Sequence, residues 1–84
     1  MAGLTMTQTI KTLDLKQLLC PMPVIRTQKA VEQLQTDEML KVICTDPGTQ
    51  HDIPALCRVN GYHLVATQQQ DQNYIFYVKK DTIS

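Results

Sequence analysis

Apolar side chains recur every three or four residues between positions 24 and 34. This spacing places them on one face of a helix, while the opposite face carries charged and polar groups. The inward face contains Val24, Thr27, Val31 and Leu34, and the outward face contains Arg26, Lys29 and Gln33. The pattern predicts a one-faced helix over residues 24–34.

A period of two follows in residues 39–44. Leu40, Val42 and Cys44 alternate there with Met39, Lys41 and Ile43. Since successive side chains of a strand point to opposite faces, and both sets here are largely apolar, the segment predicts a mostly buried strand. Asp46-Pro47-Gly48 then supplies residues that favour a turn.

A second, short helix is predicted before Asn60-Gly61, a pair typical of helix C-termini. Its inward side chains are Ile53, Leu56 and Cys57, at i, i+3 and i+4. Two signals leave its start open. Thr49 and Asp52 resemble a capping box, whereas Pro54 prefers a position close to the first turn.

Three further segments have strand character: residues 9–15, 62–67 and 74–79, with the polar stretch 68–73 as the loop of a hairpin. The predicted order is therefore βαβαββ. Because βαβ crossovers are right-handed, both helices are expected on the same side. The expected fold class is α+β, a two-layer α/β sandwich in which a four-stranded mixed sheet carries two helices on one face.

Length and composition indicate one small globular domain. The chain has 84 residues, of which 43% are hydrophobic and 19% charged. We expect a flexible N-terminal arm at residues 1–8, a single domain at 9–80 and a C-terminal tail at 81–84. No apolar run is long enough to span a membrane, and residues 1–8 lack the basic start and apolar centre of a secretory signal. A cytoplasmic protein is expected.

The formal net charge of the chain is zero. A general nucleic-acid binder needs an excess of Lys and Arg that faces phosphates. Direct, stable binding to nucleic acid is therefore not expected, nor is binding to a membrane. A monomer is the expected state.

Cys20 is the main candidate for chemistry, because it stands in Cys20-Pro21-Met22-Pro23 directly before the first helix. Pro21 and Pro23 suit a first helical turn, and Pro21 disfavours a helical Cys20, so the sulfur is expected in solvent. The positive end of the helix favours a thiolate, which predicts a fall in the pKa of this thiol from about 8.5 toward 7. Basic residues outnumber acidic ones around it, which suggests a cationic end: Lys11, Lys16, Arg26 and Lys29 against Asp14.

The remaining candidate residues favour structural roles. The three cysteines, at spacings of 24 and 13, fit neither a disulfide framework nor a zinc site. Cys44 and Cys57 are assigned to the core, and neither a metal nor a cofactor is expected. Asp52 is assigned as a helix cap, and His51 and His63 are assigned to the surface or to turns.

Four residues near Cys20 are candidates for docking a partner. Leu19 and Met22 can supply a small apolar contact, with ordinary loop packing as the alternative. Arg26 and Lys29 favour a solvated helix face, with partner docking as the alternative.

A set of short motifs is spread along the chain. They are Leu13-Asp14, Leu18, Cys20-Pro21-x-Pro23, Asp46-Pro47 and Asp52-Ile53-Pro54. Together they resemble the TusA family of small sulfur carriers, also described as SirA-like, over nearly the whole chain. The resemblance implies a βαβαββ sandwich. It also implies that Cys20 accepts a sulfane sulfur as a persulfide from a cysteine desulfurase or rhodanese-type donor and relays it to a downstream sulfur-accepting protein.

The resemblance leaves the pathway open between tRNA 2-thiouridine formation, sulfur oxidation and other sulfur traffic. It implies sulfurtransferase chemistry, but it does not imply that the protein turns over a substrate on its own. Whether such a carrier counts as an enzyme is therefore a matter of definition. Two alternatives use the same fold. One is a non-catalytic regulatory or interaction module, disfavoured by the presence of Cys20, and the other is an RNA-binding domain, disfavoured by the neutral charge.

Two positions depart from the family pattern. Gln17 stands where glycine is common before Leu18, and Asp37 stands where glycine usually follows the first helix. Asp takes a left-handed conformation at modest cost. Gln17 predicts a different shape for the loop before Cys20, which bears on the choice of partner.

Overall fold

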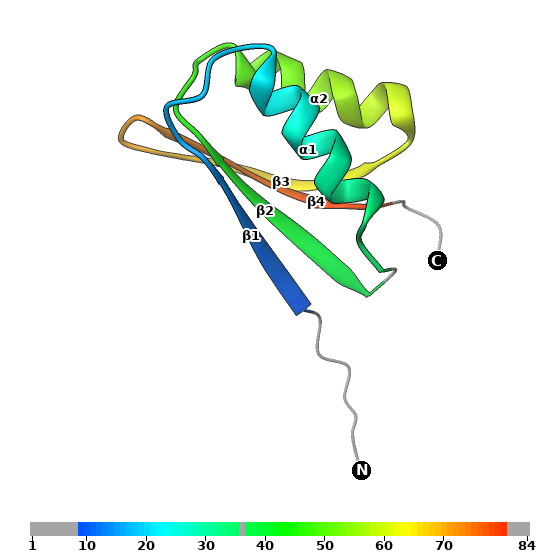
Figure 1. The fold of residues 1–84 in the computed structure, drawn as a ribbon. Helices are drawn as coiled ribbons and strands as arrows, with labels where there is room; N and C mark the ends of the chain where they lie inside the picture. Colours follow the sequence, from blue (N-terminus) through cyan, green and yellow to red (C-terminus); the bar gives the residue numbers. More distant parts are fainter. Residues whose placement is uncertain (1–8, 36, 81–84) are drawn as a thin grey trace.

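Local sequence signals and the structure agree on the order of the elements. The computed structural model describes residues 9–35 and 37–80. Its elements are β1 (Thr9–Leu15), α1 (Met22–Glu32), β2 (Glu38–Cys44), α2 (Thr49–Asn60), β3 (His63–Gln70) and β4 (Asn73–Lys79) (Figure 1). The predicted βαβαββ order is confirmed. The predicted arm at 1–8 and tail at 81–84 lie outside the described residues.

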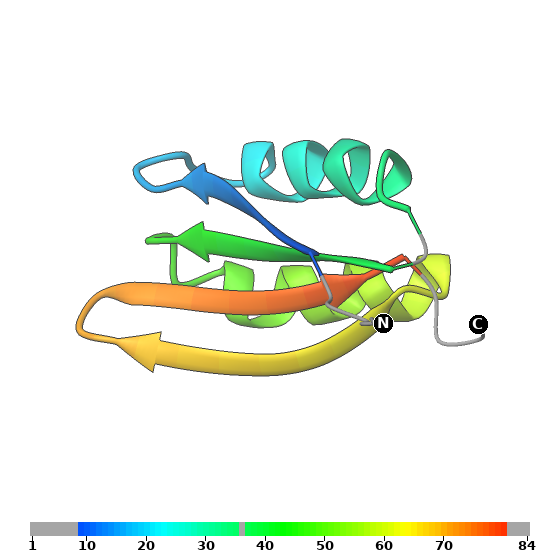
Figure 2. The same ribbon diagram turned by 90° about the horizontal axis from the view of Figure 1, so that it is seen from below.

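The four strands form one mixed sheet in the order β1-β2-β4-β3. β1 pairs in parallel with β2, and β4 pairs antiparallel with both β2 and β3. α1 joins the parallel pair, and α2 carries the chain from β2 past β4 to the edge strand β3. Both helices cover the same face of the sheet, which confirms the predicted α+β sandwich of two layers (Figures 1 and 2).

The apolar core lies between the sheet and the two helices. Its buried members are Leu15, Val31, Leu34, Leu40, Val42, Cys44, Ile53, Cys57, Phe76 and Val78. They include the alternate positions predicted for β2 and four of the inward positions predicted for the helices, Val31, Leu34, Ile53 and Cys57. Thr27 and Leu56 are also buried, and Val24 is partly buried against the core. Burying an aliphatic side chain of this kind stabilises a fold by roughly 1.5–3 kcal/mol. The assignment of Cys44 and Cys57 to the core is confirmed.

The first helix runs from Met22 to Glu32, so it begins and ends earlier than the predicted range 24–34. A proline in the first turn loses no helical hydrogen bond, which allows Pro23 to lie inside the helix. At the other end, the N–H groups of Gln33 and Leu34 bond to carbonyl oxygens three residues back, and this tightening ends the helix.

The second helix begins at Thr49, but no capping box forms. The Thr49 hydroxyl instead donates to the carbonyl oxygen of Asp46 at 2.7 Å. Pro54 lies inside the helix, beyond its first turn. The helix ends as predicted at Gly61, whose φ of 74° requires the left-handed region that glycine favours.

The predicted hairpin loop at 68–73 is longer than the turn in the structure. β3 continues to Gln70, and only Asp71 and Gln72 turn the chain into β4. Asp71 has a φ of 55°, a conformation that Asp tolerates better than most residues. The polar glutamines therefore belong to an exposed edge strand that pairs with β4. Within the described residues, neither helix has the length and apolar character needed to cross a membrane.

Candidate functional site

Two loops meet at one edge of the sheet. Because β1 and β2 are parallel, the loops that follow them leave the same edge, one leading to α1 and the other to α2. The N–H of Gln17 donates to Oγ1 of Thr45 at 2.8 Å, and the N–H of Cys20 donates to Oδ2 of Asp46 at 2.9 Å. These two bonds hold the first loop against the second.

Gln17 keeps the loop in a left-handed turn. Its φ is 72°, which lies in the region that glycine occupies without strain. The N–H of Leu18 closes the turn on the carbonyl oxygen of Leu15 at 3.2 Å. The different loop shape predicted from Gln17 is thus not required, because glutamine adopts the conformation that a glycine would favour.

Cys20 is exposed immediately before α1, as predicted. Pro21 precedes the helix, and Pro23 lies in its first turn. Neither proline has an N–H, and the N–H of Met22 already donates to the carbonyl oxygen of Leu19 at 2.9 Å. The start of α1 therefore has few N–H groups left to stabilise a thiolate.

The side chain that contacts the sulfur is acidic. Sγ of Cys20 donates to Oδ2 of Asp52 at 3.3 Å. This hydrogen bond, then partial burial and the negative charges of Asp52 and Asp46, raise the pKa of the Cys20 thiol above its ordinary value. The predicted fall in the pKa is wrong, because the carboxylates of Asp52 and Asp46 oppose negative charge on the sulfur.

The predicted cationic end is also wrong, because the charges that act on the Cys20 thiol are those of Asp52 and Asp46. Lys11 pairs with Glu38 at 3.3 Å, and Lys16 pairs with Asp14 at 3.8 Å. Both lysines are thus engaged with carboxylates other than the two nearest the sulfur.

Asp46 fixes the geometry of both loops. Its Oδ1 accepts the N–H of Gly48 at 3.0 Å, while its Oδ2 accepts the N–H of Cys20. These two backbone hydrogen bonds lower the pKa of Asp46. One carboxylate therefore joins the start of α1 to the start of α2.

The predicted role of Asp52 as a helix cap is wrong, because α2 has no side-chain cap hydrogen bond. It lies in the first turn of α2, where an acid is favourable, and its Oδ2 accepts the hydrogen bond from the thiol of Cys20. The signal that could have located it is the recurrence of Asp52, Ala55 and Val59 at i, i+3 and i+7, which puts them on one helix face.

An open groove begins at Cys20 and runs between the two helices. It has a volume of about 350 Å³ and is lined by Cys20, Pro21, Val24, Asp52, Ala55, Leu56, Val59 and Asn60. We refer to it as the Cys20 groove. Val59 on its rim is 83% exposed, and the sequence pattern did not predict a role for it.

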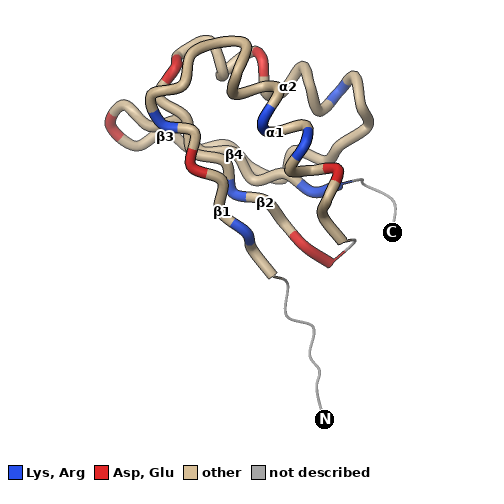
Figure 3. Tube along the Cα trace, viewed as in Figure 1, with Lys and Arg blue, Asp and Glu red and all other residues tan. Residues whose placement is uncertain are grey.

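The four residues predicted to dock a partner are all on the surface. Leu19 is 72% exposed and Met22 is 36% exposed, both beside Cys20 in the chain. Arg26 and Lys29 are exposed on α1, where Figure 3 shows the basic positions of that helix. None of the four lines the Cys20 groove. Their role in docking remains a prediction.

The other two thiols are unsuited to chemistry. Burial raises the pKa of Cys44 to about 11 and also raises the pKa of Cys57. In the described ranges 9–35 and 37–80, no three His, Cys, Asp or Glu residues are grouped in a way that could hold a metal ion. His51 and His63 are exposed, as assigned.

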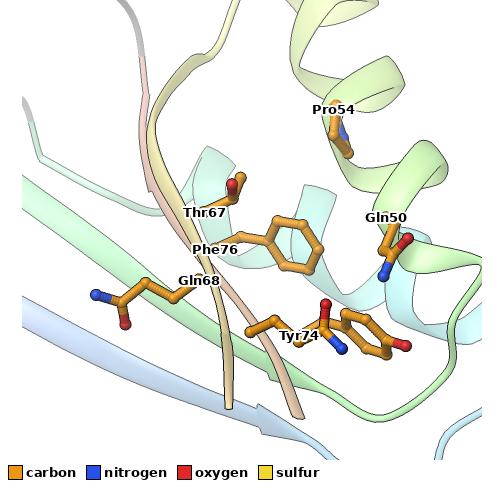
Figure 4. Close-up of a pocket in the computed structure, with 7 residues that line it drawn as sticks. Gln50, Pro54, Thr67, Gln68, Tyr74 and Phe76 are labelled. Carbon is orange, nitrogen blue, oxygen red and sulfur yellow. The ribbon is translucent and has the colours of Figure 1, made fainter. Parts of the chain in front are cut away.

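A second hollow of about 380 Å³ lies on the opposite flank of α2, against the β3–β4 hairpin. Figure 4 shows Gln50 and Pro54 from α2 facing Tyr74 and Phe76 from β4, with Thr67 and Gln68 from β3. This hollow contains no cysteine, so it is separate from the Cys20 groove.

Comparison with known proteins identifies the family. The family described as Sulfurtransferase TusA matches residues 11–80. The chain belongs to the TusA family. It is 41% identical over 69 residues to the sulfur carrier protein TusA of Pseudomonas entomophila (strain L48), covering 82% of this chain and 86% of that protein. It is 38% identical over 69 residues to a putative sulfur carrier protein of Neisseria meningitidis serogroup A, covering 82% of this chain and 93% of that protein.

The structure shows where the TusA motifs of this chain lie relative to Cys20. Three of the motifs that carry the resemblance are far apart in the sequence, yet they converge on one residue, Cys20. Cys20-Pro21-x-Pro23 presents the thiol, Asp46-Pro47 holds its backbone and Asp52-Ile53-Pro54 contacts its Sγ. The TusA motifs of this chain therefore describe one site rather than three.

Proposed function

We propose that this chain is a sulfur carrier whose Cys20 accepts a sulfane sulfur as a persulfide and relays it to an acceptor protein. The observation that carries the proposal is the position of Cys20. It is the one exposed thiol of the chain, held at the convergence of the TusA motifs, while Cys44 and Cys57 are buried.

The transfer is an exchange between sulfur atoms. The Cys20 thiol loses its proton, and Sγ attacks the terminal sulfur of a donor persulfide. A new bond forms between Sγ and that sulfur, the sulfur–sulfur bond of the donor breaks, and the donor leaves as a thiolate that takes up a proton. A thiol and a persulfide become a persulfide and a thiol, so no external oxidant or reductant is required. The same exchange in the next step returns Cys20 to the thiol.

A carrier has to hold its cargo between the two exchanges. A second thiol nearby would attack the inner sulfur, form a disulfide and expel the cargo. Cys44 and Cys57 are buried in the core, so neither serves as such a resolving group. The leaving group also matters, because a thiol of higher pKa leaves more slowly. The carboxylates beside Cys20 therefore favour retention of the bound sulfur.

The donor in this proposal is a cysteine desulfurase or a rhodanese-type protein, and the acceptor is a downstream sulfurtransferase in the cytoplasm. The pathway is either tRNA 2-thiouridine formation or sulfur-oxidation traffic. Loss of 2-thiouridine from the tRNA of a deletion strain, restored by the wild-type gene and not by Cys20→Ser, would assign the first pathway. Unchanged 2-thiouridine would assign the protein to other sulfur traffic.

The proposal is tested by loading the purified protein with a cysteine desulfurase and cysteine. Mass spectrometry of the intact protein should show the addition of one sulfur atom, removed by a reductant and located at Cys20 by peptide mapping. Cys20→Ser should gain no sulfur, whereas Cys57→Ala, which removes a buried thiol, should load as the wild type does. Loading of Cys20→Ser to the wild-type level would contradict the proposal.

A further inference from the structure

The Cys20 groove has two chemically different ends. At one end, Sγ of Cys20 lies against Asp52, and the carboxylate of Asp46 accepts the N–H of Cys20. Along the rest of the groove the walls are mostly apolar, formed by Val24, Ala55, Leu56 and Val59. A partner that fits this groove needs a group that suits the acidic end and apolar side chains that suit the rest.

In the part of the chain that the structure describes, no ion pair reaches the acidic end. Among the described residues, the two ion pairs join Lys11 to Glu38 and Lys16 to Asp14. Asp46 satisfies its oxygens with backbone N–H groups, and Asp52 receives the thiol. The negative charge next to the reactive sulfur is therefore left without a positive partner in this part of the chain.

We propose that the Cys20 groove receives an extended apolar segment of the sulfur donor, and that a lysine or arginine beside the reactive sulfur of the donor pairs with Asp52. The inference rests on the proposed function and adds the chemistry of the partner. The apolar side chains of the segment cover Ala55 and Val59, which the free protein leaves accessible, and the cation meets the carboxylates at the end of the groove.

The pairing has a consequence for the exchange itself. Attack by Cys20 requires negative charge on Sγ, and the carboxylate of Asp52 at 3.3 Å opposes that charge. A cation on the donor offsets the repulsion between the Asp52 carboxylate and the Cys20 thiolate only while the donor is bound. The thiol is thus held protonated in the free carrier and becomes reactive on docking. Anionic thiols and disulfides of small size lack such a cation and are repelled.

The test uses three synthetic peptides that carry the same cysteine, activated as a 2-pyridyl disulfide. The first flanks the cysteine with leucines and a lysine, the second replaces the lysine with glutamate, and the third replaces the leucines with serines. Attack by Cys20 forms a mixed disulfide with the peptide and releases 2-thiopyridone, whose absorbance gives the rate. The first peptide should react at least fivefold faster than either of the others.

Matched variants of the full chain connect the rates to the groove. Asp52→Asn should reduce the ratio of rates between the lysine and glutamate peptides by at least about fivefold, because one pair of unit charges about 4 Å apart in water is worth that factor and the two peptides differ by two unit charges. Asp71→Asn removes an equal charge at the tip of the β3–β4 hairpin (Figure 1) and should leave that ratio unchanged. Val59→Ser should reduce the preference for leucine over serine.

Two results would overturn the inference: equal rates for the lysine and glutamate peptides, or a ratio of these rates that Asp52→Asn leaves unchanged. Equal rates for the leucine and serine peptides would remove its apolar part. Failure of the proposed function can be distinguished from failure of this inference, because the proposed function is tested by sulfur loading and the inference by peptide rates. A protein that takes up sulfur at Cys20 without any preference among the peptides contradicts only the inference, and one that shows the preferences but takes up no sulfur contradicts the proposed function.

Discussion

The reactivity of Cys20 depends on which groups contact its sulfur. The Sγ–H group donates to Asp52, and this bond exists only in the protonated form, so it stabilises the thiol against the thiolate. Since the thiolate is the nucleophile, the rate of attack at neutral pH depends on how much of it is present. The neighbouring carboxylates therefore slow Cys20 in the free protein.

We predict that iodoacetamide, a neutral reagent, modifies the native protein at Cys20 alone and faster in Asp52→Asn. Because the pKa of Cys20 is raised by Asp52, the rate of alkylation should rise with pH to a midpoint above the ordinary thiol value. Asp52→Asn should move this midpoint to lower pH and raise the rate at pH 7 by about fivefold. Peptide mapping and the pH profile of alkylation check both statements.

The control is Asp71→Asn, which should follow the wild-type profile. Modification of Cys44 or Cys57 before Cys20 would contradict the burial of those two thiols. A midpoint in Asp52→Asn at or above that of the wild type would contradict the role given to the carboxylate.

Gln17 provides a second prediction at the scale of one residue. Its φ of 72° costs about 1–2 kcal/mol for a residue with a Cβ, and glycine removes that cost while adding freedom to the unfolded chain. Gln17→Gly is therefore expected to raise the free energy of unfolding by about 0.5–1 kcal/mol, measured by urea denaturation. Lys16→Gly, next to it, should lower the free energy of unfolding, because no positive φ is relieved there. Loss of stability in Gln17→Gly would contradict the strain.

Between elements, the loops after β1 and β2 form one unit because Asp46 bonds to both. Its two oxygens accept the N–H groups of Cys20 and Gly48, one at the start of each helix. Local patterns predicted the helices and strands, because the spacing and type of neighbouring side chains indicate each element without knowledge of the rest of the fold. They did not predict that β3 reaches Gln70, because that segment is held by pairing with β4 rather than by its own composition.

Acid should weaken the unit that Asp46 holds together. Its pKa is lowered in the folded protein by the N–H groups of Gly48 and Cys20, so its contribution to stability is present above the unfolded value of about 3.9. That contribution is lost as the pH falls through the lower, folded value. In thermal unfolding from pH 7 to pH 2, Asp46→Asn should melt below the wild type at pH 7, and the difference should narrow below about pH 4. A difference that stays constant across this range would contradict the linkage.

For the whole molecule, the fold serves to bring distant motifs to one point. The sequence placed Cys20 directly before a helix, because Pro21 and Pro23 restrict the backbone of the residues next to them. It did not locate the contact with Asp52, which lies 32 residues away and depends on the packing of α1 beside α2. The error about the pKa of the thiol has this same origin. Local geometry can be derived from adjacent residues, whereas the electrostatics of the site needs the assembled fold.

Because Sγ lies in solvent outside the core, the cargo should leave the stability of the scaffold nearly unchanged. We predict that the protein carrying a persulfide or a carbamidomethyl group on Cys20 unfolds within about 4 °C of the unmodified protein. Leu40→Ala, which opens a cavity beneath the helices, is the contrasting control and should lower the midpoint by roughly 10 °C or more. Differential scanning calorimetry checks both. A large shift on modifying Cys20 would mean that its side chain packs into the core, and this carrier would then have to unfold locally each time it takes up or releases sulfur.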